Sequence, residues 1–347
     1  MIKENGWLSW VIKEDLELLE TNPNEFWEGV EIIGAWAFHG CKKLTSVKLP
    51  STLKKIRKSA FSCSGLTCVE IPEGVEEIGD GAFGLCYNLT SVKFPSTLKK
   101  IGDCAFSEAS VTSIEIPEGV EEIGVGAFHD CEKLTRVKLP SALKKIEKIA
   151  FAETSVISIE IPEGVESIDD KAFRGCKNLT SVKLPSTLKE IRDGVFKATG
   201  LTSIEIPEGV EEIGEEAFQS CEKLTSIKLP STLKEIGDFA FKETGLTNIE
   251  IPTSVIITGK HAFDDKTALH YKGYIIKGTE KCSSINALNS MIFGFRYIDD
   301  IEGAVAHLRS KGADITKEER VAETDKAENA EVKSSPKQAN KNTGKGE

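Results

Sequence analysis

The cysteines are the residues of this sequence with the most informative chemistry, because thiolates bind metals, form disulfides and act as nucleophiles. The chain has nine of them, and no Cys-x-x-Cys pair is present to start a zinc site. The one disulfide that the sequence leaves open joins Cys63 to Cys41 or Cys86. We otherwise expect free thiols that pack as small hydrophobic groups. Five cysteines recur every 45 residues: Cys41, Cys86, Cys131, Cys176 and Cys221.

The histidines and carboxylates form no catalytic pattern. The five histidines are spread over the chain, at His39, His129, His261, His270 and His307. The sequence has no glycine-rich phosphate loop, no nucleophile elbow and no Ser/His/Asp arrangement. We therefore predict that the protein is not an enzyme and that it needs no cofactor and no metal.

The elements that position these residues are internal repeats. A Pro that follows an apolar-charged-apolar triplet recurs from Pro50 to Pro252, at alternating intervals of 22 and 23 residues. An Ala-Phe or Val-Phe pair recurs in step with it from Phe38 to Phe263. The true period is therefore a 45-residue pair of unequal half-repeats. Because residues 25–30 align with the segment 45 residues later, we assign the array to residues 21–263.

Each half-repeat has the pattern of one turn of a solenoid. The run Leu44–Leu49 alternates like a short strand with an apolar inner face, Pro50 ends it, and the chain returns through Leu53 and Ile56. One unit offers about six core side chains, which cannot offset the conformational entropy of about 22 ordered residues. The units must therefore stack. Cysteines two units apart then lie about 10 Å from each other, too far for a disulfide.

A resemblance to a known family is carried by residues 44–56, which read Leu-Thr-Ser-Val-Lys-Leu-Pro-Ser-Thr-Leu-Lys-Lys-Ile, and by the Ala-Phe and Cys that follow in the repeats. They resemble the BspA-like (Treponema-type) leucine-rich repeat over about residues 24–270. The resemblance implies an α/β repeat solenoid with a parallel β-sheet of about eleven short strands. Many members are surface or secreted proteins of bacteria and protozoan parasites that bind host proteins or other cells. The family has no catalytic residues to carry over.

Charged residues occupy fixed columns of the predicted stack. The outward residue of each strand alternates in sign: Lys48, Glu70, Lys93, Glu115, Lys138, Glu160, Lys183, Glu205, Lys228 and Glu250. Since strands lie about 4.8 Å apart, each Lys is expected between two Glu. The return side begins with the same alternation, from Lys54-Lys55 to Glu76-Glu77. We interpret these columns as a self-neutralising ladder. A charged stripe that docks a partner is the alternative.

Candidate partner-binding residues lie where the repeats vary, in the segments after each Phe, which should form loops along one edge. The candidates on this edge are Tyr87, His129, Arg174 and Gln219. Arg136 is a fifth candidate, because it is the one large residue in an outward strand column that otherwise consists almost wholly of Ser. Unconstrained drift of the loop sequence is the alternative.

A solenoid exposes its core at both ends, so we expect helical caps there. At the N-terminus, Trp7, Val11 and Leu18 have roughly helical spacing, which predicts a capping helix within residues 1–20. A helix that docks another protein is the alternative.

The C-terminal part has three segments. Residues 270–276 are predicted to form a closing strand or hairpin. The apolar spacing from Met291 to Leu308 then predicts a helix, so residues 264–313 form a C-terminal cap or a small helical module. Residues 314–347 are rich in charge and have no Leu or aromatic residue, and we expect a disordered tail.

Composition restricts the partner and the location. The 347 residues include 44 Lys and Arg against 55 Asp and Glu, a net charge of −11, which lacks the basic surface of a nucleic-acid-binding protein. No stretch approaches the roughly 18 apolar residues of a membrane span, and no classical secretion signal is evident. We expect a cytoplasmic monomer without membrane insertion. Secretion into a host cell or surface display by another route is the alternative.

The favoured function is a non-enzymatic protein–protein interaction solenoid that binds another protein. In that case the chain would be a bacterial or parasite protein, and its partner could be a protein of the host. An enzyme or regulator with its activity in residues 270–347, and the repeats as a targeting scaffold, is the alternative from another class. A convergent polar pocket in that region would favour it. A passive structural spacer is the third hypothesis, and a reproducible partner that depends on the edge loops would exclude it.

Overall fold

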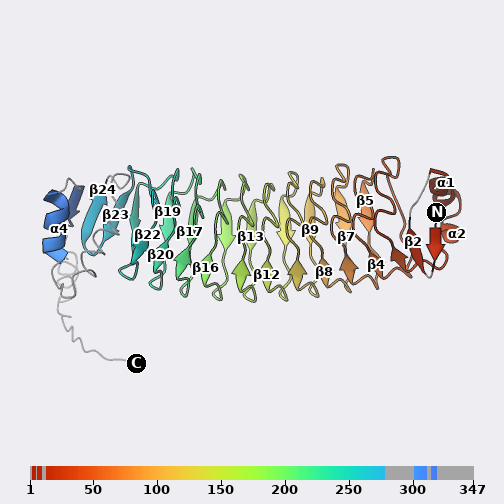
Figure 1. Ribbon diagram of the computed structural model, residues 1–347, viewed down its shortest axis with the longest axis horizontal. Coiled ribbons are helices and arrows are strands. Elements are labelled where there is room, and N and C mark those ends of the chain that lie inside the picture. Colours follow the sequence, from red (N-terminus) through yellow and green to blue (C-terminus); the bar gives the residue numbers. More distant parts are fainter. Residues whose placement is uncertain (1, 5, 10–12, 278–300, 311–313, 319–347) are drawn as a thin grey trace, which may run out of the picture.

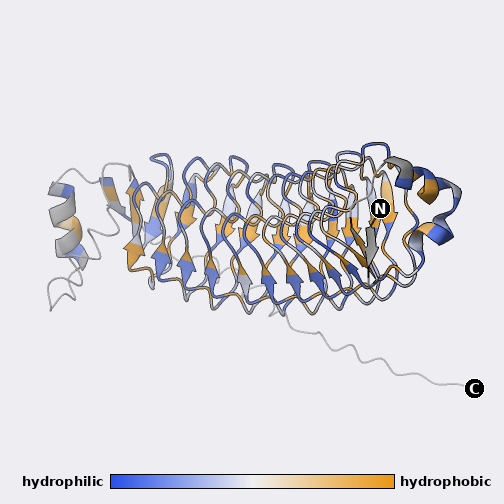
Figure 2. Ribbon diagram, turned by 45° about the vertical axis from the view of Figure 1, so that its right-hand side comes forward, coloured by the Kyte–Doolittle hydropathy of each residue, from blue (hydrophilic) through white to orange (hydrophobic). Residues whose placement is uncertain are grey.

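The computed structural model describes residues 2–4, 6–9, 13–277, 301–310 and 314–318. The chain forms an elongated stack of short turns, with the N-terminal and C-terminal elements at opposite ends (Figure 1). Hydrophobic and hydrophilic residues repeat from turn to turn along the whole stack (Figure 2). The predicted parallel solenoid of about eleven turns is confirmed.

Each turn contributes strands to two rows rather than to the single sheet that we expected. The long-strand row consists of three-residue strands: β5 (Cys68–Glu70), β7 (Ser91–Lys93), β9 (Ser113–Glu115), β11 (Arg136–Lys138), β13 (Ser158–Glu160), β15 (Ser181–Lys183), β17 (Ser203–Glu205), β19 (Ser226–Lys228) and β21 (Asn248–Glu250). The short-strand row consists of two-residue strands: β3 (Ile32–Ile33), β4 (Lys55–Ile56), β6 (Glu77–Ile78), β8 (Lys100–Ile101), β10 (Glu122–Ile123), β12 (Lys145–Ile146), β14 (Ser167–Ile168), β16 (Glu190–Ile191), β18 (Glu212–Ile213), β20 (Glu235–Ile236) and β22 (Ile257–Thr258).

The two rows differ in continuity. The short-strand row is one sheet from β3 to β14 and a second sheet from β16 to β22. The long-strand row pairs two by two, as β5 with β7, β9 with β11, β13 with β15 and β17 with β19. Each of these pairs joins a Glu-type strand to the Lys-type strand that follows it, with Glu115 opposite Lys138, for example. The 45-residue period is therefore a structural unit and not only a sequence pattern.

The core between the rows is built from columns of identical residues. The rings of the repeated Phe stack from Phe38 to Phe263, with centroids 4.8 to 5.9 Å apart. Cys131 and Cys176 are buried beside this column, and each thiol donates a hydrogen bond of 3.1 Å to the carbonyl of the Phe 25 residues earlier. Burial raises the pKa of Cys131 to about 12 and that of Cys176 to about 11. The cysteines of the described part are free thiols, including Cys63.

The N-terminal cap differs from the expected helix. Residues Ile2–Glu4 (β1) and Trp7–Ser9 (β2) form an antiparallel hairpin, and β2 extends the short-strand row by pairing with β3. Helices follow only at Lys13–Thr21 (α1) and Pro23–Trp27 (α2). The prediction of a helix through Trp7 was wrong, because the exposed edge of β3 accepts a strand that buries Leu8 completely against the core. Val11 lies outside the described residues.

At the C-terminal end, Ala268–Tyr271 (β23) and Tyr274–Lys277 (β24) form the predicted hairpin, and β23 pairs with β21. Helix α4 (Ile301–Ser310) falls within the predicted helical segment, whereas Met291 lies outside the described residues. Asp314–Lys317 (β25) pairs with β24, so the expected disordered tail does not begin at residue 314. Ile315 explains this difference, because it is buried in the core. Residues 319–347 lie outside the described part.

Candidate protein-binding surfaces

The outer face of the long-strand row is covered by Glu–Lys pairs. Lys93 Nζ lies 2.6 Å from Glu70 Oε1, and Lys138 Nζ lies 2.5 Å from Glu115 Oε1. The same pair recurs as Lys183–Glu160 and Lys228–Glu205. The hydrogen bond to Glu70 and the charge of that Glu raise the pKa of Lys93. In these four pairs the Lys binds the Glu of the preceding turn, so the alternating column provides one ion pair for each of these Lys. These pairs are exposed and individually weak.

A second set of carboxylates on this face binds backbone rather than lysine. Glu118 Oε2 accepts hydrogen bonds of 2.8 Å from both the amide and the hydroxyl of Ser141 in the next turn. Glu73 and Glu163 bind Ser96 and Ser186 in the same way. The Ser141 amide, and then its hydroxyl, lower the pKa of Glu118. Both sets of charges are thus satisfied within the stack, which supports the interpretation as a self-neutralising ladder.

The loop edge displays Tyr87, whose side chain is 60% exposed. Its hydroxyl donates a 3.3 Å hydrogen bond to Glu108 Oε2, and its carbonyl accepts a 2.6 Å bond from the Ser110 hydroxyl. Partial desolvation, followed by the Glu108 charge, raises the pKa of the Tyr87 hydroxyl. The ring is therefore exposed and also held in place from the next turn.

The other edge candidates lie on every second turn and do not contact one another in the described structure. His129 is adjacent to the Glu108 turn, where its carbonyl accepts a 2.8 Å hydrogen bond from the Glu108 amide. Its Nδ1 lies 3.8 Å from Asp130 Oδ2. Arg174 is exposed. Gln219 is half-buried, and its Oε1 is buried with no hydrogen-bond partner in the described part, so it does not present its amide oxygen to solvent.

Arg136 lies away from this edge, at the start of β11 on the outer face of the long-strand row. It is exposed and lies opposite Ser113. The structure therefore places one candidate on the strand face and the others on the loop edge, and it does not gather the five into one pocket.

A run of charged side chains interrupts the short-strand row, and the sequence analysis missed it. The residue after the strand Ile is Gly in most turns, and a Cβ at Gly124 would lie 2.6 Å from the backbone nitrogen of Asp103 in the preceding turn. Glu147, Asp169 and Arg192 occupy this position in three consecutive turns. The missing Gly in these three repeats was the sequence signal.

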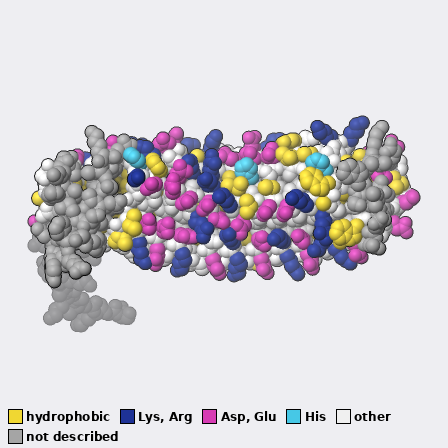
Figure 3. Space-filling model, in the orientation of Figure 1, with side chains coloured by type: hydrophobic (Ala, Val, Ile, Leu, Met, Phe, Trp, Pro, Cys, Tyr) yellow, Lys and Arg dark blue, Asp and Glu magenta, His cyan; other side chains and the backbone are white. Residues whose placement is uncertain are grey.

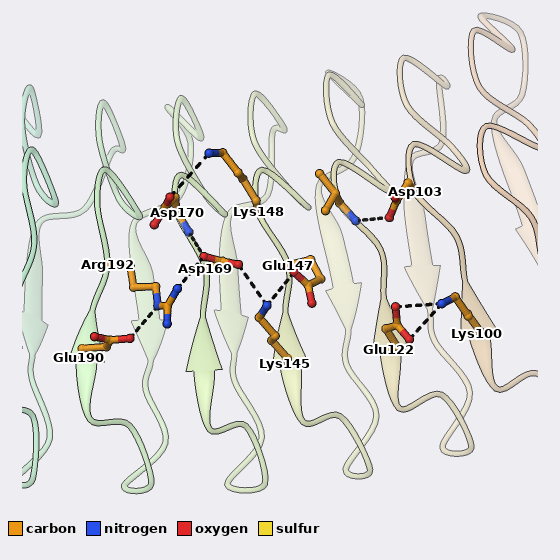
Figure 4. Close-up of polar contacts among 11 residues, drawn as sticks. Lys100, Asp103, Glu122, Lys145, Glu147, Lys148, Asp169, Asp170, Glu190 and Arg192 are labelled. Atoms are coloured by element: carbon orange, nitrogen blue, oxygen red, sulfur yellow. Dashed lines mark hydrogen bonds and ion pairs between the residues drawn. The ribbon is translucent and has the colours of Figure 1, made fainter.

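These residues form a chain of ion pairs across three turns (Figure 4). Lys145 Nζ lies 2.8 Å from Glu147 Oε2 and 3.1 Å from Asp169 Oδ2. Arg192 Nη1 lies 3.1 Å from Asp169 Oδ1, and Arg192 Nε lies 2.7 Å from Glu190 Oε1. Burial works against ionisation of Asp169, but the Asp170 amide, Lys145 and Arg192 outweigh it and lower the pKa of this carboxyl.

Two consecutive turns of the stack are farther apart at the ion-pair chain than elsewhere in the Phe column. The short-strand row is broken between β14 and β16, and the Phe173 and Phe196 rings have the largest spacing in the Phe column, 5.9 Å. Beyond it the expected charge alternation lapses, because Glu190, Glu212 and Glu235 follow one another in register. Burial, and then Glu235 and Glu190, raise the pKa of Glu212. The break in the short-strand row, the largest Phe spacing and the change in the charge pattern thus lie at or next to the ion-pair chain.

A polar groove of about 500 Å³ lies where the array meets the C-terminal hairpin. Glu250, His270, Lys272 and Glu318 are among its lining residues. His270 takes the register position opposite Glu250 that Lys holds in the other pairs, and its Nδ1 lies 2.5 Å from Glu318 Oε1.

The described residues offer neither a metal site nor a membrane-spanning helix. Among the described residues, no group of three or more His, Cys, Asp or Glu is arranged to hold a metal ion. Within the same part of the chain, no helix has the length and apolar character needed to cross a membrane. The visible face of the molecule mixes positive, negative and hydrophobic side chains (Figure 3).

Comparison with known proteins gives one family and a set of related folds. The BspA type leucine rich repeat region matches residues 21–135, 99–221 and 189–286, in six copies. A leucine-rich repeat protein of Bacteroides ovatus is 30% identical over 70% of this chain and 78% of its own, with a TM-score of 0.54. A leucine rich cell surface protein of Faecalibacterium prausnitzii is 27% identical over 71% of this chain and 78% of its own, with a TM-score of 0.42. No functionally curated protein matches the sequence.

Proposed function

Because this chain belongs to the BspA-type leucine-rich repeat family, we propose that it is a non-enzymatic interaction solenoid that binds another protein as a monomer. The observation that carries the proposal is the exposed Tyr87 ring, which is anchored by Glu108 and Ser110. Tyr and Arg are the residue types that most often dominate binding energy, and a ring that is already ordered loses little entropy on binding. Together with His129 and Arg174 on later turns, Tyr87 gives the loop edge aromatic and cationic side chains. On the strand face, the charged side chains are already bound to one another.

The proposal predicts that a partner depends on the loop edge. In affinity capture from the native cells and from host cells, wild-type protein should retain a reproducible partner. The triple variant Tyr87→Ala, His129→Ala, Arg174→Ala should lose at least about 90% of it, since loss of two anchors costs about 2–4 kcal/mol. The control Lys144→Ala makes the same change in net charge at an exposed site of the short-strand row and should retain the partner. Equal capture by the triple variant and the control contradicts the proposal.

We further propose that the protein works in a reducing compartment such as the cytoplasm. Its support is the number of cysteines that are free in the described part, since thiols are kept reduced in the cytoplasm and cysteines of exported proteins are more often in disulfides. Fractionation of the producing cells checks this. Recovery of the protein outside the cytoplasmic fraction rejects it in favour of export or surface display.

A second candidate function is a binding or catalytic activity in the C-terminal region, residues 270–347. The observation in its favour is the polar groove with the His270–Glu318 pair, because a carboxylate that orients a histidine is a common acid–base arrangement. Ligand-induced stabilisation of the wild-type protein that is lost in His270→Asn, with partner capture unchanged, supports this candidate. The same stabilisation in both proteins rejects it.

A further inference from the structure

The first Lys-type segment of the long-strand row has no strand partner. Ser46–Lys48 has the same sequence as β7 and β15, Ser-Val-Lys, and each of those pairs with a Glu-type strand of the preceding turn. The corresponding preceding segment here is residues 23–25, which begin helix α2. Pro23 starts this helix after the Asn22 cap, and the Glu25 carboxylate accepts a 2.8 Å hydrogen bond from Asn22 Nδ2. The helical caps of the array have therefore replaced one strand of a pair.

As a consequence, the backbone groups and the Lys side chain of this segment lack the partners that the equivalent strands have. In the described part of the chain, the backbone amides and carbonyls of Ser46, Val47 and Lys48 form no hydrogen bond. Lys48 also has no acidic partner there, whereas the equivalent Nζ atoms of Lys93 and Lys138 lie 2.6 and 2.5 Å from a Glu. Unpaired backbone groups along a strand edge are the feature that recruits an added strand. A Lys without an acidic partner can then select a segment that carries a carboxylate.

The space beside this segment is open. A groove of about 810 Å³ is bounded on one side by Thr45–Leu49 and on the other by Leu19 and Glu20 of α1 and Pro23 of α2. Helices α1 and α2 lie at the N-terminal end of the stack (Figure 1). A four-residue extended peptide is about 13 Å long and needs only about 4.8 Å of separation from the strand that it pairs with. The groove has the volume for such a segment.

We propose that this groove binds an extended segment of a partner protein by strand addition to Ser46–Lys48, with one carboxylate of that segment on Lys48. This rests on the proposed protein-binding function and gives it a second contact site. The chemistry of the occupant follows from the strands that fill the equivalent place in later turns. In β9, Glu115 lies between the buried Ile114 and Ile116, and it binds the Lys of the next turn. The expected ligand is therefore a single Glu between two aliphatic residues, parallel to Ser46–Lys48.

The charges that line the groove limit the ligand to about one carboxylate. Its lining includes two cations, Lys43 and Lys48, and two carboxylates, Glu20 and Glu70, of which Glu70 already binds Lys93. A peptide with several adjacent acidic residues would meet these two Glu and be repelled. Binding should hence be selective for the aliphatic-Glu-aliphatic pattern rather than for negative charge in general.

The test uses a labelled, C-terminally amidated seven-residue peptide with the sequence of residues 111–117, Val-Thr-Ser-Ile-Glu-Ile-Pro, which has a single Glu, and the full chain. Fluorescence anisotropy should show saturable binding to the wild type and at least about tenfold weaker binding to Lys48→Glu, because a charge-assisted pair becomes a repulsive one. The control Lys144→Glu makes the same charge change outside the groove and should bind as the wild type. A peptide with Lys in place of its Glu115 equivalent should prefer Lys48→Glu.

The outcomes separate this inference from the proposed function. No saturable binding below about 1 mM peptide, or equal affinity for wild type and Lys48→Glu, overturns the inference, while partner capture through Tyr87 is measured independently. An unchanged thermal midpoint of Lys48→Glu, expected because Lys48 makes no ion pair in the described structure, excludes loss of folding as the cause. A dimer in sedimentation equilibrium that Lys48→Glu dissociates would also overturn it, since the occupant would then be a second copy.

Discussion

Asp169 is the residue on which the central ion-pair chain depends. Its side chain is only 16% exposed, and it binds Lys145 from one turn and Arg192 from another. Because the folded protein lowers its pKa, ionised Asp169 stabilises the fold at pH values above its unfolded pKa of about 3.9. That contribution is lost as the pH falls through the lowered pKa of the folded state.

Asp169→Asn should therefore lower the free energy of unfolding by about 1–2 kcal/mol at pH 7, since the amide keeps the volume but not the charge that pairs with both cations. The difference from the wild type should shrink when denaturant unfolding is repeated at about pH 3, because the unfolded carboxyl, with a pKa of about 3.9, is then largely protonated and unfolding takes up a proton. Asp170→Asn is the control, because Asp170 is more exposed and has one longer ion pair, 3.6 Å to Lys148. A loss at pH 3 as large as at pH 7 would show that the effect is not electrostatic.

Single residues differ in how far the sequence predicts their surroundings. The buried state of Cys131 and Cys176 followed from their period, because every second turn places them at the same point of the core. Gln219 has the same period as His129 and Arg174, yet its amide oxygen is buried. The direction of a side chain in a loop depends on its neighbours in the adjacent turns. An alignment of equivalent repeat positions does not contain that information.

At the scale of the turn, two glycines of one repeat have different roles. Gly124 lies where a Cβ would be 2.6 Å from backbone atoms of the preceding turn, and β10 is paired on both of its sides. At Gly126 an added Cβ would make ordinary van der Waals contacts, the nearest at 3.4 Å to Cys104 Sγ, but the φ of +60° lies in the left-handed region. The first glycine sets the spacing between turns, and the second permits the bend before Phe128.

Gly124→Ala should accordingly lower the free energy of unfolding by about 2–3 kcal/mol, because the backbone of two packed turns must separate. Gly126→Ala should cost only about 1 kcal/mol, the penalty of a left-handed L-residue. Each variant serves as the control for the other in denaturant unfolding of the full chain. Similar losses for the two variants would mean that backbone conformation, rather than the approach of the turns, limits this position.

The sequence predicts the elements that follow the repeat pattern. It does not predict an element whose conformation depends on pairing with the free edge of a strand. The long strands follow from the alternation around Val47 and its equivalents, and the C-terminal hairpin from residues 270–276. Trp7–Ser9 was assigned to a helix because its spacing fits one, but the open edge of β3 offers backbone hydrogen bonds that a helix cannot use. The short-strand row was missed because two residues per turn are too few to show an alternation.

At the scale of the whole molecule, the Glu-type and Lys-type turns form one structural unit. Within a unit, the strands pair in register, Lys binds Glu, and Ser binds a second Glu, as Ser96 does with Glu73. Between units, the long strands do not pair. The stability of a solenoid is the sum of its units and their interfaces, so the unit that can be removed cleanly should have 45 residues.

Deletion of residues 96–140 removes one such unit and places Ser141 opposite Glu73, in the position of Ser96, so every remaining Glu–Lys pair is kept. Deletion of residues 96–117 removes only a Glu-type turn and places Lys138 beside Lys93, which leaves Lys138 without Glu115. The protein without residues 96–140 should unfold within about 5 °C of the wild type. The protein without residues 96–117 should unfold at a clearly lower temperature although it is longer, because two Lys and two unmatched strands meet at its junction. Thermal unfolding followed by circular dichroism checks both. Equal midpoints for the two deletions would show that the half-repeat, and not the 45-residue pair, is the unit from which this solenoid is built.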